Sequence, residues 1–229
     1  ALADLIPDHA ADDIRITVQQ GLLLGEVHPN ALPHLYQALK SIDLADPGFN
    51  TILDITACPG TDTCNLGVTN STAVSHEIES YLAQKHPQLA ENKDIQIKIS
   101  GCMNSCGQHM AAQIGLHGSS IKVNDRIVPA MQLVLGGGLD PDGDAFIGEK
   151  VIKLPTKRIL RAFDLILGDY TSHREEKESF NHYYYRTGKK HFYHLLKELA
   201  DTDDLSEEEF RDWGQPAEYV QAIGVGECA

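Results

Sequence analysis

The chain has 229 residues, 42% hydrophobic and 23% charged, a composition that excludes a disordered or fibrous protein. Its 33 acidic and 19 basic side chains give a formal net charge of −14, which would repel a phosphate backbone, so we expect no nucleic-acid partner. No stretch approaches the roughly 18 apolar residues that a membrane span needs. We therefore expect no signal peptide, no membrane partner and a cytoplasmic location.

The first fifty residues predict a small α/β unit. Residues 14–18 alternate between apolar and polar side chains, as in a strand, and residues 32–39 carry leucines at helical spacing. Pro47 and Gly48 end the unit.

Two predicted strands then lead into loops that each hold two cysteines. The segment 51–55 runs into Cys58 and Cys64, and the apolar residues of 67–85 recur as on one face of an amphipathic helix.

A second alternating strand over 95–99 runs into Cys102 and Cys106. The order strand, cysteine loop and helix is thus predicted twice, which indicates a mixed sheet with the cysteines gathered at one edge.

The four cysteines have the spacing of a metal centre. Cys58-x5-Cys64 is separated by 37 residues from Cys102-x3-Cys106. Four thiolates on two loops can enclose an iron–sulfur cubane. Structural zinc is the alternative, although the x5 spacing is wider than zinc sites usually have. Four unligated thiols are the third interpretation.

The rest of the chain predicts short antiparallel strands followed by helices. The strands cover 114–116, 120–123, 126–128 and 132–135, with a hairpin turn at Asn124-Asp125. Helices are expected after Pro155 and over 187–199, with a capping box at Ser206 and Glu209.

An acidic segment and a basic cluster are each interpreted more simply as surface features than as binding sites. Asp140, Asp142 and Asp144 are followed by Glu149 at the wrong offset for an EF-hand, which favours a surface turn. A basic cluster could face an acidic electron donor, although a solvated helix face is the simpler interpretation. Its members are Lys150, Lys153, Lys157, Arg158 and Arg161.

At the cysteines the sequence resembles the sulfite/nitrite reductase haemoprotein family, whose members contain sirohaem and a 4Fe-4S cluster. The runs Thr56–Cys64 and Ser100–Gly107 match the family signature C-x5-C followed by G-C-x-N-x-C. The segments 15–20, 112–116 and 133–137 resemble its flanking strands. The resemblance covers residues 13 to about 190.

The resemblance implies roles for single residues. Cys58, Cys64, Cys102 and Cys106 would ligate the cluster, Cys106 would also bridge it to the sirohaem iron, and Asn104 would help to hold the sirohaem. The Arg and Lys side chains that contact the anionic substrate in this family belong to its first half, so the catalytic residues are not found in this chain. Cys228 has no assigned role.

We therefore expect an α+β chain with three parts: a second ferredoxin-like half domain over 1–50, a mixed α/β domain for sirohaem and the 4Fe-4S cluster over 51–175, and a helical C-terminal extension over 176–229.

The expected function is the cluster-binding part of an assimilatory-type reductase that converts sulfite to sulfide or nitrite to ammonia with six electrons. Its expected partners are the N-terminal half of the same enzyme, a ferredoxin or flavoprotein donor and a small anion. Because the chain starts at Ala1 and resembles only the second half, we expect an inactive fragment. The alternative is a zinc-binding or interaction protein that uses the same cysteines.

Overall fold

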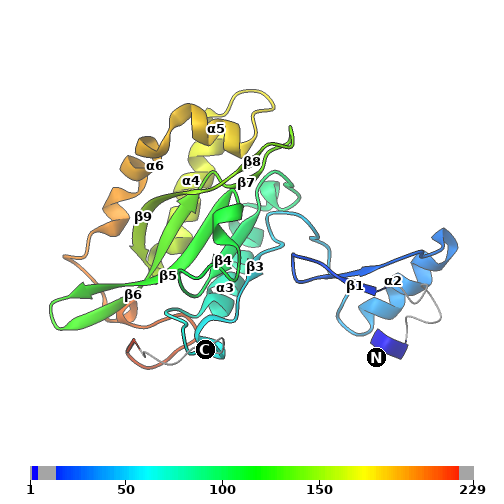
Figure 1. Ribbon diagram of the computed structural model, residues 1–229, viewed down its shortest axis with the longest axis horizontal. Coiled ribbons are helices and arrows are strands. Elements are labelled where there is room, and N and C mark those ends of the chain that lie inside the picture. Colours follow the sequence, from blue (N-terminus) through cyan, green and yellow to red (C-terminus); the bar gives the residue numbers. More distant parts are fainter. Residues whose placement is uncertain (1, 5–13, 222–229) are drawn as a thin grey trace. The chain divides into compact units, whose positions relative to one another are not determined.

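The computed structural model describes residues 2–4 and 14–221, which fall into two compact units, Ala1–Phe49 and Asn50–Ala229 (Figure 1). Cys228 lies outside the described residues. The predicted division at 175 stays a prediction, and residues 176–221 belong to the second unit.

The first unit contains a hairpin and a helix. Strands β1 (Ile14–Ile16) and β2 (Leu22–Leu24) pair antiparallel, with Ile14 opposite Leu24. A 3-10 turn, η1 (Pro29–Ala31), leads into α2 (Leu32–Lys40), the helix predicted from its leucine spacing. Leu35 is the buried residue of α2.

The second unit is built on a five-stranded mixed sheet in the order β3-β4-β5-β6-β9. Strands β3, β4 and β5 run parallel, and β6 and β9 are antiparallel to their neighbours. The strands are β3 (Thr56–Ala57), β4 (Ile97–Ser100), β5 (Ile114–Val123), β6 (Arg126–Leu135) and β9 (Glu149–Pro155). A separate hairpin joins β7 (Gly138–Leu139) to β8 (Ala145–Phe146).

Among the described residues, four helices flank this sheet (Figure 1). In sequence, the first lies between β3 and β4, and the other three follow β9. They are α3 (Ser71–Lys85), α4 (Ile159–His173), α5 (Phe180–Thr187) and α6 (Lys189–Leu196). Short 3-10 turns lie at η2 (Gly60–Asp62), η3 (Pro87–Leu89), η4 (His109–Ala111), η5 (Thr156–Arg158), η6 (Lys197–Ala200) and η7 (Glu207–Phe210). No helix in the described part of the chain is long and apolar enough to cross a membrane.

The core lies between one face of the sheet and these helices. Alternate residues of the central strands, such as Ile97, Ile114 and Leu133, are buried with apolar side chains of α3 and α4. The aromatic residues that open α5, Phe180, Tyr183 and Tyr184, are buried in the same cluster.

Several predicted elements were wrong in extent. Residues 51–55 form turns and not a strand, because Asp54 Oδ2 accepts the amide of Asn50 (2.8 Å) and the Asp54 amide donates to Thr51 O (3.0 Å). The second cysteine loop is followed by the short turn η4 and not by a helix.

The C-terminal elements also differ from the prediction. The helix predicted over 187–199 is present as α6 and η6 but begins only after Gly188, whose φ of 83° is a conformation that side chains rarely adopt. The capping box at Ser206 and Glu209 is confirmed, but it starts only the 3-10 turn η7. From Arg211 to Gln221 the predicted helical extension has no helix.

Candidate metal centre

The two cysteine loops leave the sheet side by side. Cys58 follows β3 and Cys102 lies two residues beyond β4, and these strands are parallel neighbours. The Cys58 amide donates to Ile99 O (3.1 Å), and the Gly101 amide donates to the Cys58 sulfur (3.1 Å). The first loop therefore begins against the start of the second.

The loops interlock at glycines. Gly101 O accepts the amides of Val68 (2.8 Å) and Thr69 (3.1 Å). A Cβ added to Gly101 would lie 2.5 Å from Gly60 Cα, and one added to Gly60 would lie 2.5 Å from Thr69 O. Only glycine fits where the backbones approach so closely, so these residues fix the loops against each other.

The first loop is closed by its own backbone. The Cys64 amide donates to Gly60 O (3.0 Å), and the Gly67 amide donates to Cys64 O (2.9 Å). Ser71, the first residue of α3, donates from Oγ to Cys58 O (2.6 Å). Ser71 Oγ also lies 3.6 Å from the Cys58 sulfur. The start of α3 thus holds the position of Cys58.

The second loop is equally tight. Ser105 and Gln108 adopt positive φ angles of 66° and 57°, and the Gln108 amide donates to Ser105 O (2.8 Å). The Gly107 amide donates to Ser100 Oγ (3.1 Å), which ties the loop back to β4. Cys106 is exposed, whereas Cys58, Cys64 and Cys102 are partly exposed.

A cavity of about 370 Å³ opens beside the second loop. Cys102 and Asn104 line it together with His117 of β5. The structure therefore brings Asn104 and Cys102 to one wall. The remaining lining residues are Leu66, Val68, Met103, Gly118, Ser119, Ser120 and Gln221.

His117 was not singled out from the sequence. His117 is 6% exposed, and its Nδ1 lies 3.1 Å from Gly118 O. Because a carbonyl oxygen can only accept a hydrogen bond, Nδ1 carries the proton. Nε2 has no partner among the described residues. Burial lowers the pKa of His117, so the neutral ring presents a buried acceptor. The signal was a histidine that directly follows the apolar start of the strand, Ile114 to Leu116.

His109 packs against His117, with ring centroids 4.7 Å apart. Its Nδ1 shares a hydrogen bond with Ser100 Oγ (2.9 Å). Burial, followed by the repulsion of His117, lowers the pKa of His109 to about 4. The contact with Ser100 holds the His109 ring at the end of β4.

Basic side chains lie on this polar face of the sheet. In the sheet register Ser100, His117, Gln132 and Lys153 form one row across the strands. In the neighbouring row, buried Lys98 donates to Gln108 Oε1 (2.9 Å), and burial lowers its pKa.

The predicted basic cluster is divided between two environments. Lys150 and Lys153 lie on β9, whereas Lys157 and Arg158 in η5 pair with Glu208 (3.3 Å) and Glu209 (2.5 Å). The cluster is therefore not one helix face.

The C-terminal segment 206–221 contacts the first cysteine loop, which the sequence did not predict. Asp212 Oδ2 accepts the amide of Asn70 (2.7 Å), the N-cap of α3, and the Tyr219 hydroxyl donates to Val68 O (2.7 Å). These contacts span 142 and 151 residues of sequence, so no local pattern could reveal them.

The donor set is four thiolates on two loops, which a 4Fe-4S cluster can use. Among the residues that the structure describes, no three cysteine sulfur atoms lie within 4.8 Å of one another, as the ligands of a single zinc ion would. A cubane binds each thiolate to a different iron and therefore spaces the sulfurs more widely. The amide donor at Cys58 is the kind of contact that stabilises a cluster-bound thiolate.

The fold is an α+β domain in which two cysteine loops leave neighbouring strands of a mixed sheet. The chain belongs to the family described as nitrite and sulphite reductase 4Fe-4S domain, whose model matches residues 48–203. This membership supports an iron–sulfur cluster in the chain.

Relatives agree with this membership. The chain is 28% identical over 181 residues to the assimilatory ferredoxin-dependent nitrite reductase of Haloferax mediterranei, with 78% of this chain and 30% of the relative covered. It is 28% identical over 205 residues to the sulfite reductase (NADPH) hemoprotein beta-component of Bacillus pumilus, with 82% and 31% covered. The chain thus spans about a third of the length of these relatives.

Solved structures share the fold. The NirA protein of Mycobacterium tuberculosis aligns with a TM-score of 0.68 at 25% identity, covering 83% of this chain and 36% of NirA. Dissimilatory sulfite reductase I aligns with a TM-score of 0.63 at 12% identity, covering 96% and 72%, and this likeness concerns the fold alone.

Proposed function

We propose that this chain is the cluster-binding part of an assimilatory-type sulfite or nitrite reductase. Cys58, Cys64, Cys102 and Cys106 hold the 4Fe-4S cluster, and Cys106 also bridges it to a sirohaem. The full enzyme reduces sulfite to sulfide or nitrite to ammonia. Residues 1–50 would be the second ferredoxin-like half domain of that enzyme.

One observation carries the proposal. The two cysteine loops interlock through Gly60 and Gly101, so both cysteine pairs lie at one edge of the sheet. The cavity beside Cys102 and Asn104 offers space on the side where the proposal requires the haem.

The residues of this chain would hold the cluster and position the haem. When bound, the two cofactors would pass the six electrons from the external donor to the substrate. The Gly101 amide, which donates to the Cys58 sulfur, would stabilise the ligated thiolate and adjust the cluster potential. Asn104 would contact the haem, and His117 Nε2 would offer an acceptor at the cavity wall.

The partners follow from the same proposal. The relatives are described as ferredoxin-dependent or NADPH-dependent, which supports a ferredoxin or flavoprotein donor. We place the reaction in the cytoplasm. The anion-contacting Arg and Lys side chains would come from the N-terminal half of the enzyme.

The test is anaerobic reconstitution with iron and sulfide, followed by metal and acid-labile sulfide analysis. We expect about four irons and four sulfides per chain and a broad absorption band near ~400 nm. Stoichiometric zinc without iron after expression in zinc-supplemented medium, together with failed reconstitution, would contradict the proposal and favour the zinc-binding alternative.

The bridging role of Cys106 needs a test in the full-length enzyme. Cys106→Ser should weaken the magnetic coupling between cluster and haem and abolish turnover. Cys228→Ser is the matched control, because no role is assigned to that thiol. Unchanged coupling and turnover in Cys106→Ser would remove the bridge from the proposal.

A further inference from the structure

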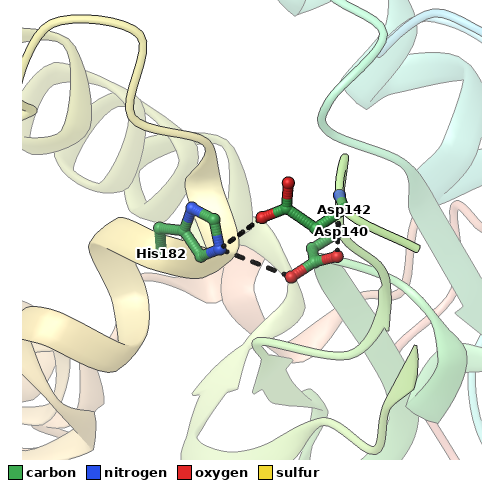
Figure 2. Close-up of side chains that lie close together, drawn as sticks. All are labelled: Asp140, Asp142 and His182. Atoms are coloured by element: carbon green, nitrogen blue, oxygen red, sulfur yellow. Dashed lines mark hydrogen bonds and ion pairs between the residues drawn. The ribbon is translucent and has the colours of Figure 1, made fainter. Parts of the chain in front are cut away.

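Two carboxylates and an imidazole converge away from the cysteine loops. Asp140 and Asp142 lie in the turn between β7 and β8, and His182 lies on α5. Figure 2 shows the three side chains pointing toward one another. Their ligand atoms all lie within 4.8 Å of one another.

The distances suit atoms that share one small ion. His182 Nε2 lies 3.4 Å from Asp140 Oδ2 and 3.5 Å from Asp142 Oδ2. Two other histidine–aspartate pairs are shorter, 2.6 Å for His191–Asp169 and 2.9 Å for His86–Asp164, and His173–Asp169 is similar at 3.3 Å. Atoms that bind a tetrahedral ion at about 2.1 Å lie about 3.4 Å apart.

Asp140 is positioned before any ion binds. Its side chain is 2% exposed, and Oδ1 accepts the amides of Asp142 (3.0 Å) and Asp144 (2.9 Å). Oδ2 is therefore turned toward His182. A buried carboxylate that has a second carboxylate nearby requires compensating positive charge, and a divalent cation compensates both.

The two elements that supply the ligands are already held together. Asn181, next to His182, is 1% exposed and donates from Nδ2 to Gly137 O (3.1 Å), at the start of the β7–β8 segment. The Ser179 side chain caps α5 by accepting the His182 amide (3.3 Å). The backbone at His182 is thus fixed relative to the turn independently of an ion.

We propose that Asp140, Asp142 and His182 bind one divalent first-row metal ion of the zinc or manganese type. Water completes the shell, because the side chains of Asp142 and His182 are 72% and 49% exposed. The ion joins the β7–β8 turn to α5 and thereby stabilises the domain. This site uses oxygen and nitrogen ligands, and it does not depend on the cysteine cluster.

The experiment uses Mn²⁺ as the probe, because carboxylate ligands suit it and thiolates select softer metals. The full chain is titrated, and free Mn²⁺ is measured by its electron paramagnetic resonance signal. We expect one bound Mn²⁺ per chain that Zn²⁺ displaces. His182→Gln should weaken the affinity at least ~100-fold, because it removes a direct ligand.

The matched control is His173→Gln, since His173 is also exposed and faces a carboxylate, Asp169, at 3.3 Å. It should bind Mn²⁺ like the unchanged protein. Asp142→Asn provides a second variant at an exposed position, and its thermal midpoint should no longer rise with Mn²⁺. Absence of Mn²⁺ binding to the unchanged chain at millimolar ion, or equal binding by His182→Gln, would overturn the proposal.

Discussion

Gly101 is the residue whose substitution would test the contact between the cysteine loops most directly. A Cβ there would meet Gly60 Cα at 2.5 Å, and this backbone atom cannot rotate away as a flexible side chain could. We expect Gly101→Ala to lower the free energy of unfolding by about 1–3 kcal/mol, the usual cost of overpacking. It should also reduce the iron retained after reconstitution.

Gly168→Ala is the control for Gly101→Ala. Gly168 lies within α4, and a Cβ added to it would meet nothing within 4 Å. The substitution should stabilise the protein by up to about 1 kcal/mol, because alanine favours the helix. Denaturant unfolding of both variants gives the comparison, and equal effects would show that loop contact is not the cause.

His109 makes stability depend on pH. Its pKa in the folded protein is about 4, against 6.5 for an ordinary histidine. Between these two pH values the unfolded chain binds more protons than the folded chain. The contribution of His109 to the free energy of unfolding is therefore fully present above pH 6.5 and is lost as the pH falls toward 4. We expect this histidine alone to cost about 2 kcal/mol between pH 7 and pH 5.

The measurement compares unfolding of the unchanged chain and of His109→Gln at both pH values, in the same cofactor state. Glutamine keeps a polar group near Ser100 but does not titrate. The variant should lose less stability between pH 7 and pH 5 than the unchanged chain does. An equal loss in both proteins would assign the pH dependence to other groups.

At the scale of elements, the segment 206–221 supports the start of α3 and the first cysteine loop. Asp212 is buried and accepts the amides of Asn70 (2.7 Å) and Trp213 (2.9 Å). Asp212→Ala would leave the Asn70 amide without its acceptor, which costs about 1–3 kcal/mol for a buried group. We expect lower stability and faster loss of the reconstituted cluster in air.

Two variants separate this role from a general effect of charge. Asp212→Asn keeps an acceptor oxygen and should restore most of the cluster lifetime. Asp204→Ala removes an exposed carboxylate and should change neither quantity. The bleaching rate of the cluster band in air and the unfolding midpoint are read for each protein. A cluster lifetime in Asp212→Ala equal to that of the unchanged chain would contradict the role.

The elements also show how far sequence patterns reached. Spacing predicted the cysteine loops, α2, most of α3 and the hairpin turn at Asn124-Asp125, because these depend on local periodicity. The two short strands predicted over 114–116 and 120–123 form one continuous strand, β5. Gly118 is required because a Cβ would lie 2.0 Å from Gly101 O of the cysteine loop.

What remained hidden depends on contacts between distant parts of the chain. Asp212 reaches Asn70 across 142 residues, and His182 faces a turn that the sequence indicated only as a surface feature. Gly188 separates α5 from α6 by its positive φ, and only the folded backbone shows that angle. Local patterns therefore predicted the two cysteine loops but not the residues that support them.

At the scale of the whole molecule, charge decides what the chain can hold by itself. A net charge of −14 opposes a haem with several carboxylates and an anionic substrate, and the chain spans about a third of its curated relatives. The cysteine loops, in contrast, are fixed by contacts within residues 50–221. The chain should thus bind the cluster without a partner, but not the sirohaem.

This expectation is tested by expressing the chain alone and together with the N-terminal part of a relative, in cells that make sirohaem. Alone, the purified chain should contain iron and sulfide but lack the haem absorption bands and any sulfite- or nitrite-dependent oxidation of a reduced dye. Co-expression should add the haem bands, because the partner supplies the basic side chains that neutralise the haem carboxylates. Haem retained at full occupancy by the chain alone would show that charge does not limit binding, and the polar row through His117 and Lys153 would then be the place to seek the compensating groups.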